Sequence, residues 1–143
     1  MFSTPIFNSA EVGGCIDLYT DSDLKLAWAA GFFEGEGCFG QQFYRAKNGG
    51  EHIYPRMYLN NTNHEAIQKF HEAVQCGKVY GPYQQRNRLH SDFWQWSLTN
   101  KSQIRKLTTI FAPYLSTRRL ERAKELGIVP LSGFRNDRVG PLN

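Results

Sequence analysis

Two glutamates stand inside a glycine-rich run whose other residues are small or apolar. The run AAGFFEGEGCFG, residues 29–40, holds Glu34 and Glu36 among four glycines, two alanines, three phenylalanines and a cysteine. Carboxylates are ligands that hard cations such as Mg²⁺ prefer, and they also serve as general acids and bases. The run therefore indicates either a cation site or an acid–base site.

The residues around this run predict a helix that ends within it. From Asp21 the apolar side chains of DSDLKLAWAAGFF recur at helical spacing, with an aspartate or serine as the expected N-cap and Gly35 or Gly37 as the expected end. Glu34 and Glu36 then lie at the C-terminal end, where the helix dipole disfavours negative charge. Because a helix end that served packing alone would not need these acids, we expect a functional site here.

Two nucleotide-binding motifs resemble part of the run but lack their context. Residues 35–40 fit G-x-G-x-x-G, yet a dinucleotide site places a strand before its glycines and a helix after them, the reverse of the order expected here. A kinase glycine loop would need HRD and DFG triplets, and neither occurs in the sequence. We therefore expect no nucleotide cofactor.

Small residues recur every four positions along the predicted helix. Ala27, Gly31 and Gly35 form a smooth stripe, with Ala30 beside it, against which a second helix can pack closely. The alternative interpretation is that the stripe serves packing within the fold. That interpretation leaves the two glutamates without a purpose.

Residues 26–39, LAWAAGFFEGEGCF, resemble the signature of the LAGLIDADG homing endonucleases, with AAGFFEGEG aligned on those nine letters. The resemblance implies that this helix packs against a second copy of itself. It also implies that the acid at the eighth position, Glu36, binds a divalent metal. Glu34 takes the sixth position, which in the family is more structural than catalytic. Both acids are glutamate where the name of the signature has aspartate.

The resemblance extends to the order of elements and to the segment before the last helix. It implies an αββαββα core over residues 21–129. The stretch PYLSTRR resembles the segment from which a basic residue reaches the active site, which places Arg118 in that role with Arg119 as a DNA-contacting neighbour. The end of the second strand is expected to supply a polar residue that holds active-site water, either Asn60 or Asn61.

A single copy of the motif predicts a homodimer. Two chains are needed to bring two Glu36 carboxylates together, and we expect their first helices to cross at Ala27, Ala30, Gly31 and Gly35. The Gly35 carbonyl is expected to add a ligand for Mg²⁺, for which Ca²⁺ or Mn²⁺ can substitute. Such a dimer would make a metal-dependent double-strand break in a long pseudo-palindromic DNA target. The alternative is an RNA-splicing maturase or a non-cleaving nucleic-acid-binding module on the same fold.

The rest of the sequence predicts a four-stranded antiparallel sheet. An Asn-Gly turn joins the first two strands, Thr62 and Glu65 form a capping box for the next helix, and Pro113 separates the last two helices. We expect strands at residues 38–47, 51–60, 77–84 and 93–99, and further helices at 63–75, 101–111 and 117–129. On the second strand, the predicted core face carries Ile53, Pro55, Met57 and Leu59. The fold class is therefore α+β, with a twisted sheet and helices on one face.

Basic side chains follow the predicted first helix. Residues 1–36 hold one base and six acids, whereas residues 37–143 hold sixteen bases and seven acids, which favours a polyanionic partner such as double-stranded DNA. By alternation along the strands, the expected base contacts are Gln42, Tyr44, Tyr54, Arg56, Tyr58, Lys78, Tyr80, Gln95 and Ser97. In or near the turns, the expected contacts to phosphates or flanking bases are Arg45, Lys47, Arg86 and Arg88.

The length of the chain predicts one domain. We expect that domain at residues 21–129, between an N-terminal arm at 1–20 and a C-terminal tail at 130–143. No apolar run is long enough to span a membrane, and the first residues lack the pattern of a signal peptide. Three cysteines without a CxxC pair indicate reduced thiols. These features predict an intracellular protein, and the resemblance implies that it is DNA-associated.

Overall fold

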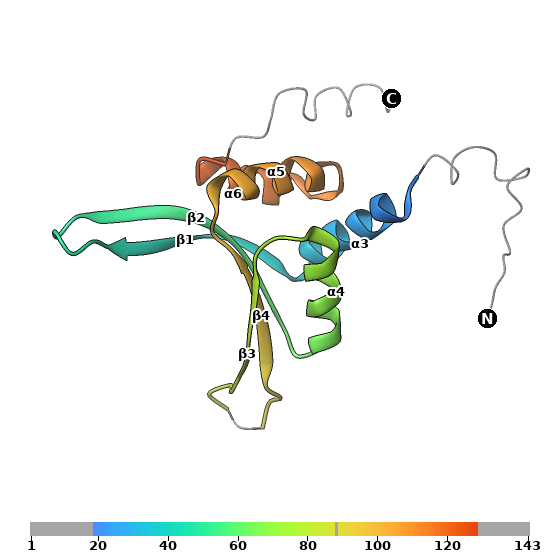
Figure 1. Cartoon of the computed structure of the whole chain (residues 1–143), viewed down its shortest axis with the longest axis horizontal. Coiled ribbons are helices and arrows are strands. Elements are labelled where there is room, and N and C mark those ends of the chain that lie inside the picture. Colours follow the sequence, from blue (N-terminus) through green and yellow to red (C-terminus); the bar gives the residue numbers. More distant parts are fainter. Residues whose placement is uncertain (1–18, 88, 129–143) are drawn as a thin grey trace, which may run out of the picture.

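The fold repeats the order of one helix followed by two strands and then adds two helices. The computed structural model describes residues 19–87 and 89–128 of the chain (Figure 1). Its elements are α3 (Asp21–Glu36), β1 (Gly37–Arg45), β2 (Glu51–Asn61), α4 (His64–Val74), β3 (Lys78–Tyr83), β4 (Phe93–Leu98), α5 (Lys101–Phe111), the 3-10 turn η1 (Ala112–Tyr114) and α6 (Thr117–Glu125). This order confirms the predicted αββαββα core. The predicted tail, and all but the last two residues of the predicted arm, lie outside the described residues.

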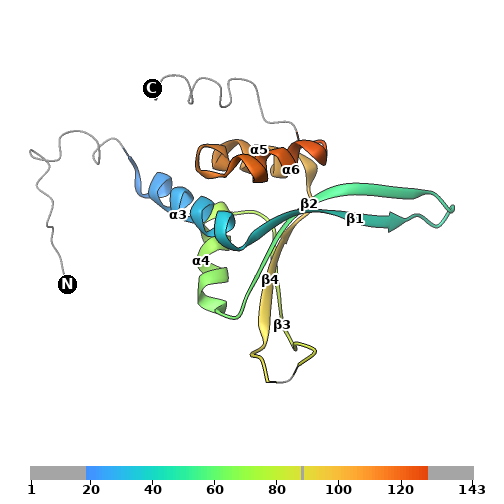
Figure 2. The same ribbon diagram turned by 180° about the vertical axis from the view of Figure 1, so that it is seen from behind.

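The four strands form one antiparallel sheet in the order β1-β2-β4-β3. The central strands β2 and β4 carry contacts to α4, and β2 also contacts α3 and α5. Figures 1 and 2 show that the sheet is strongly twisted and that the β1–β2 hairpin extends well beyond the helices. The predicted class, an α+β fold with a four-stranded antiparallel sheet, is therefore confirmed. Over the described ranges, no helix combines the length and the apolar character needed to cross a membrane.

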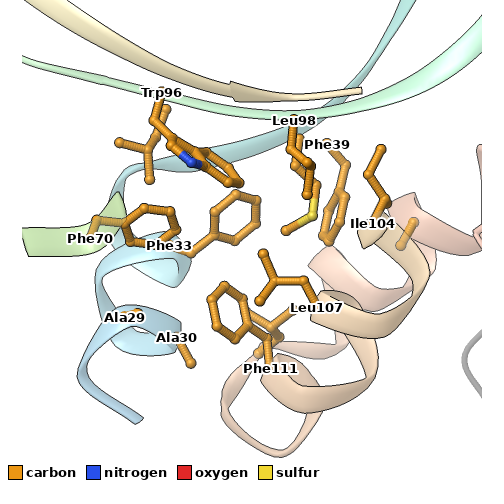
Figure 3. Packing of buried hydrophobic residues seen from close by; sticks show 14 of the residues in the cluster. Ala29, Ala30, Phe33, Phe39, Phe70, Trp96, Leu98, Ile104, Leu107 and Phe111 are labelled. Carbon is orange, nitrogen blue, oxygen red and sulfur yellow. The ribbon is translucent and has the colours of Figure 1, made fainter. Parts of the chain in front are cut away.

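Aromatic rings fill the space between the helices and the sheet. Phe33 of α3, Phe70 of α4 and Phe111 of α5 are fully buried, as is Trp96 of β4 (Figure 3). The Phe70 ring meets Trp96 edge-on at a centroid distance of 4.7 Å, and the centroids of Phe33 and Phe111 lie 5.9 Å apart. Trp96 Nε1 donates a hydrogen bond to the Cys76 carbonyl at 2.8 Å. Because each ring comes from a different element, this cluster fixes three helices on the sheet.

The predicted core face of β2 is confirmed over its second half. Pro55, Met57 and Leu59 are buried, whereas Ile53 is 55% exposed. The prediction for Ile53 is wrong because the hairpin has passed the end of the helices at that point. Its partner across the hairpin, Phe43, is 67% exposed for the same reason.

The N-caps of two helices differ from the predicted residues. Thr20 caps α3: its side chain accepts from the Asp23 N–H, and the Asp23 side chain accepts from the Thr20 N–H, both at 3.0 Å. Asn63, not Thr62, caps α4 by accepting from the Ala66 N–H at 3.1 Å. In both helices the cap is the residue with extended backbone directly before the first helical turn.

Gly77 and Gly127 share a backbone φ of +82° but differ in their surroundings. A Cβ atom at Gly77 would lie 2.5 Å from Trp96 Nε1 and 2.8 Å from the Ser97 carbonyl oxygen, whereas at Gly127 it would meet nothing within 4 Å. We expect Gly127→Ala to lower the free energy of unfolding by about 1–2 kcal/mol through backbone strain alone. Gly77→Ala should cost about 1–3 kcal/mol more through overpacking. Urea unfolding measures both, and an equal loss in the two variants would contradict the packing at Gly77.

Candidate active site and nucleic-acid interface

Glu36 is the last residue of α3, and it is exposed to solvent. Asn61, the last residue of β2, donates from Nδ2 to Glu36 Oε1 at 3.0 Å. Asn61 Oδ1 in turn accepts from the Asn63 N–H at 2.7 Å. The Asn61 amide is thus oriented by a hydrogen bond at each end, and it holds the Glu36 carboxylate between the helix and the sheet.

The structure distinguishes the two asparagines that the sequence left as alternatives. Because neighbouring residues of a strand point to opposite faces, only Asn61 donates to Glu36. Asn60 lies on the polar face of the sheet and accepts from Gln95 Nε2 at 2.9 Å. Both asparagines still line one hollow beside Glu36, with a volume of about 430 Å³.

Gln85 lines the same hollow as Glu36, although no sequence pattern points to it. Gln85 belongs to the connection between β3 and β4, and its Nε2 donates to the Ser91 carbonyl at 2.8 Å. No motif marks this residue. Its position depends on how the β3–β4 hairpin lies beside the end of α3, which a local pattern does not encode.

Glu34 serves contacts within the chain. Its Oε1 accepts from the Ser116 N–H at 2.9 Å and forms an ion pair with Arg119 Nε at 3.5 Å. Ser116 is the N-cap of α6. Glu34 therefore fastens the start of α6 to the end of α3, as expected of a structural acid.

Arg119 is predicted to contact DNA, but its side chain contacts its own chain. Its Nε donates to the Glu34 carbonyl at 2.9 Å, its Nη1 donates to the Gly37 carbonyl, and its guanidinium lies 5.8 Å from the centre of the Phe33 ring. Only 18% of the side chain is exposed. The donors of Arg119 are directed at the backbone of the α3–β1 junction, so the residue supports the fold there.

Arg118 differs from its neighbour because it is exposed. It lines a second hollow, of about 360 Å³, together with Gly37, Cys38 and Arg122. No hydrogen bond or ion pair engages Arg118 within the described part of the chain. Gly37, which lines this hollow, directly follows Glu36 in the chain. Arg118 therefore presents a positive charge beside the α3–β1 junction.

The last turn of α3 presents backbone oxygen atoms next to Glu36. The Phe33 carbonyl accepts from the Gly37 N–H, and the Glu34 carbonyl accepts from Arg119. The Gly35 carbonyl follows in the same turn, where the helix has no further amide to donate. The carboxylate of Glu36 and the carbonyl of Gly35 are oxygen donors of the kind that Mg²⁺ prefers.

Small residues leave one face of α3 open. At Gly31 and Gly35, which are both exposed, an added Cβ atom would meet nothing within 4 Å, and Ala27 is half-buried. Ala30, also predicted for the interface, is fully buried in the core of its own chain (Figure 3). That prediction is wrong because Ala30 faces the aromatic cluster.

Large apolar side chains continue the open face toward the start of α3. Leu24 and Trp28 precede Gly31 and Gly35 at helical spacing, and they are 51% and 44% exposed. Leu24 and Ala27 also line a hollow of about 550 Å³ shared with residues of α5 and η1. An apolar surface of this kind is typical of an interaction site.

The strand register places the predicted base contacts on one face of the sheet. Residues opposite each other in antiparallel strands share a face, and Gln42 pairs with Tyr54 while Tyr80 pairs with Gln95. A groove of about 510 Å³ runs over this face. Its lining includes seven of the predicted contacts: Gln42, Tyr54, Arg56, Lys78, Tyr80, Gln95 and Ser97.

The other predicted contacts lie at the edges of this face or beneath it. Tyr44, Arg45, Lys47 and Arg86 are exposed at or near the ends of the hairpins. Arg45 forms an ion pair with an acid of the facing strand at 3.4 Å. Arg88 lies outside the described residues.

Tyr58 supports Arg56 within the groove. The Arg56 guanidinium carbon lies 4.3 Å from the centre of the Tyr58 ring. Burial raises the pKa of the Tyr58 phenol, and the neighbouring Cys38 thiol raises it further. Tyr58 therefore remains a neutral phenol at physiological pH.

Several solved structures share this fold. The homing endonuclease I-CvuI, in complex with a DNA target, matches with a TM-score of 0.58 and 18% identity over 74% of this chain and 66% of that one. I-TnaI, also a homing endonuclease, matches with a TM-score of 0.54 and 21% identity over 71% of this chain and 68% of that one. The intron-encoded homing endonuclease I-CeuI, complexed with DNA, matches with a TM-score of 0.56 and 15% identity over 76% of this chain and 53% of that one. The chain spans about half to two thirds of these relatives, and at these identities the likeness shows the fold.

Comparison of the sequence itself identifies the family. No curated protein sequence matches the chain. Residues 29–126, more than half of the chain, match the LAGLIDADG endonuclease profile, and this span includes Glu34, Glu36 and Arg118. The chain therefore belongs to the LAGLIDADG endonuclease family.

Proposed function

We propose that the chain is a site-specific DNA endonuclease that works as a homodimer and hydrolyses phosphodiester bonds with Mg²⁺. The observation that carries this proposal is the exposed Glu36 carboxylate, which Asn61 holds at the end of a helix with an open face. Packing within the chain gives no reason for an acid at this position. Hydrolysis of a phosphodiester gives such a reason, because the reaction needs anionic ligands that hold a cation beside the phosphate.

Two glycines in α3 support the homodimer. Each costs the helix about 1 kcal/mol relative to alanine. In the described residues, an added Cβ atom at Gly31 or Gly35 would meet nothing within 4 Å. A second copy of α3, packed closely across this face, would account for both glycines. Two-fold symmetry would then bring the two Glu36 residues together, since each directly follows Gly35.

The oxygen atoms at this helix end fit a hard divalent cation. Glu36 would bind it through its carboxylate and Gly35 through its backbone carbonyl, with Ca²⁺ or Mn²⁺ as substitutes for Mg²⁺. Among the described residues, no three His, Cys, Asp or Glu side chains cluster, so a partner's Glu36 would supply a second carboxylate. When bound, such a cation neutralises charge that develops on the phosphoryl oxygens and favours ionised water.

Other residues of the chain would complete the site. Asn61 keeps the Glu36 carboxylate in place through its Nδ2 hydrogen bond. The hollow beside Glu36, lined by Asn60 and Gln85, offers amide groups that can orient the attacking water. Arg118 is exposed and can donate to the non-bridging oxygens of the phosphate, where negative charge increases during the reaction.

The polar face of the sheet supports recognition of duplex DNA. A twisted antiparallel sheet can lie in the major groove and present alternate side chains to the base edges. All but one of the chain's 17 lysines and arginines follow residue 36, which favours a polyanion. Two copies of the chain imply a long target with two half-sites related by approximate two-fold symmetry. A maturase or a non-cleaving module could use the same surface, but neither needs Glu36.

Replacement of Glu36 by glutamine should abolish cleavage and leave DNA binding largely intact, because the amide keeps the size of the side chain but loses its charge. We expect the cleavage rate to fall by about 100-fold or more, because a bound cation stabilises the transition state by several kcal/mol. The assay incubates the protein with a library of duplexes that contain a long randomised segment, in Mg²⁺ or in EDTA, and sequences the new ends.

The matched control for this experiment is Glu72→Gln, which removes an exposed glutamate from α4. We expect this variant to cleave as the unsubstituted protein does. Undiminished cleavage by Glu36→Gln, or cleavage that persists in EDTA, would refute the assignment of Glu36. Binding without cleavage by the unsubstituted protein would favour the maturase or the non-cleaving module.

Replacement of Gly31 by leucine should prevent close approach of two α3 helices. The folded chain should tolerate leucine, since an added Cβ atom at this exposed position would meet nothing within 4 Å beyond the backbone of its own helix and its chain neighbours. We expect the mass in solution, measured by light scattering, to fall from about twice 16.4 kDa to about 16.4 kDa, with an unchanged circular dichroism spectrum. Gln68→Leu, at an exposed position of α4, is the control and should remain dimeric. A dimeric Gly31→Leu protein would show that the interface lies elsewhere.

A further inference from the structure

A hydrogen-bonded network fixes one arginine in the middle of the polar face of the sheet. Arg56 Nε donates to Ser97 Oγ at 3.1 Å, and Arg56 Nη2 donates to Gln95 Oε1 at 2.9 Å. The guanidinium also lies over the Tyr58 ring at 4.3 Å. We propose that Arg56 reads a guanine in the major groove of the target and that Ser97, Gln95 and Tyr58 hold it in position. The proposal rests on the proposed function and names a specificity determinant of that function.

The contacts of Arg56 leave one edge of its guanidinium available. A guanidinium carries five N–H donors, one on Nε and two on each terminal nitrogen. The edge formed by Nε and Nη2 is occupied by Ser97 and Gln95. The two donors of Nη1 and the second donor of Nη2 remain. One donor of Nη1 and the second donor of Nη2 form the end-on fork that can donate two parallel hydrogen bonds.

Gln95 is a positioning residue in this network. Its Oε1 accepts from Arg56, and its Nε2 donates to Asn60 Oδ1 at 2.9 Å. Only one orientation of the Gln95 amide satisfies both bonds, so the network also determines which atom faces which neighbour. The amide keeps one donor and one lone pair, so the base contact of Gln95 stays a prediction beside its role in positioning Arg56.

The place of Arg56 in the sheet favours a base over a phosphate. Arg56 belongs to β2, a central strand; it is half-buried and lines the groove together with Tyr54 and Gln95. A strand that lies in the major groove directs its middle residues at base edges, whereas phosphates run along the rims of the groove. The exposed cations at the hairpin ends, such as Lys47 and Arg86, are better placed for those rims.

Guanine is the base that matches a fork of donors. In the major groove it presents two acceptors, N7 and O6, side by side. Adenine presents an acceptor beside a donor, cytosine presents a donor, and thymine presents one acceptor beside a methyl group. Because Arg56 is already held in place, little side-chain freedom is lost on binding, which sharpens this choice. A homodimer would carry two such arginines and read one guanine in each half-site.

The experiment selects bound duplexes from a randomised library and sequences them. It uses Glu36→Gln protein, so that the library is not cleaved, with and without the second substitution Arg56→Gln. The single variant should enrich a guanine at one position of each half-site. The double variant should lose that preference by about tenfold or more while keeping the preferences at other positions.

Two further variants separate the recognition of guanine by Arg56 from a general effect of positive charge and from a loss of folding. Arg45→Gln removes an exposed arginine of the same sheet and should leave the guanine preference at the Arg56 position intact. Ser97→Ala removes one anchor of Arg56 and should weaken the same guanine preference, with little change in affinity for duplexes that lack the guanine. Thermal unfolding of each variant identifies any loss of fold.

The outcomes distinguish this inference from the proposed function. If Arg56→Gln lowers affinity equally for all sequences, with the guanine preference unchanged or never present, Arg56 contacts a phosphate and the inference is wrong. If Ser97→Ala leaves the preference at full strength, the positioning network is wrong. If the Glu36→Gln protein enriches no duplex although it is folded, then sequence-specific DNA recognition, and with it the proposed function, fails first.

Discussion

One arginine holds the C-terminal end of α3, and the geometry of the candidate site depends on it. The last carbonyls of a helix lack amide partners, and here two glutamates add negative charge at the same place. Arg119 supplies hydrogen-bond donors for the carbonyls of Glu34, in the last turn, and of Gly37, the C-cap. It also brings positive charge to this end of the helix. Because Arg119 belongs to α6, the same contacts set where α6, and with it Arg118, stands relative to Glu36.

The chain changes directly from helix to strand at Gly37, and this change places Glu36 beside Asn61. A side chain at this position would overlap the Phe33 ring, so only glycine fits between the core and the start of β1. Gly37 then pairs with Leu59, two residues before the end of β2. This register brings Asn61 beside Glu36 without any intervening loop. The hydrogen bond between them is thus a consequence of how β1 begins.

Local patterns in the sequence predicted the elements, whereas the contacts between elements had to be seen. The spacing of apolar residues and the Asn-Gly turn act within a few residues, and the helices and hairpin they predict are present. Alternation alone places Ile53 in the core, because the pattern does not tell where the covering helices stop. Asn60 and Asn61 could not be separated because a shift of one residue reverses the face of a strand. Gln85 carries no local signal at all.

Under the proposed function, α3 divides two conflicting tasks along its length. Two Glu36 carboxylates that meet at a two-fold axis repel each other, so this end of the helix opposes dimerisation until a cation binds between them. Attraction must then come from elsewhere on the same face. Leu24 and Trp28 supply exposed apolar surface two or more turns away from the acids, toward the start of α3. The proposed dimer would therefore be held by its apolar half, while its acidic half would close fully only with the cation bound. In such a dimer, metal binding and dimerisation would be linked, since each would lower the free-energy cost of the other.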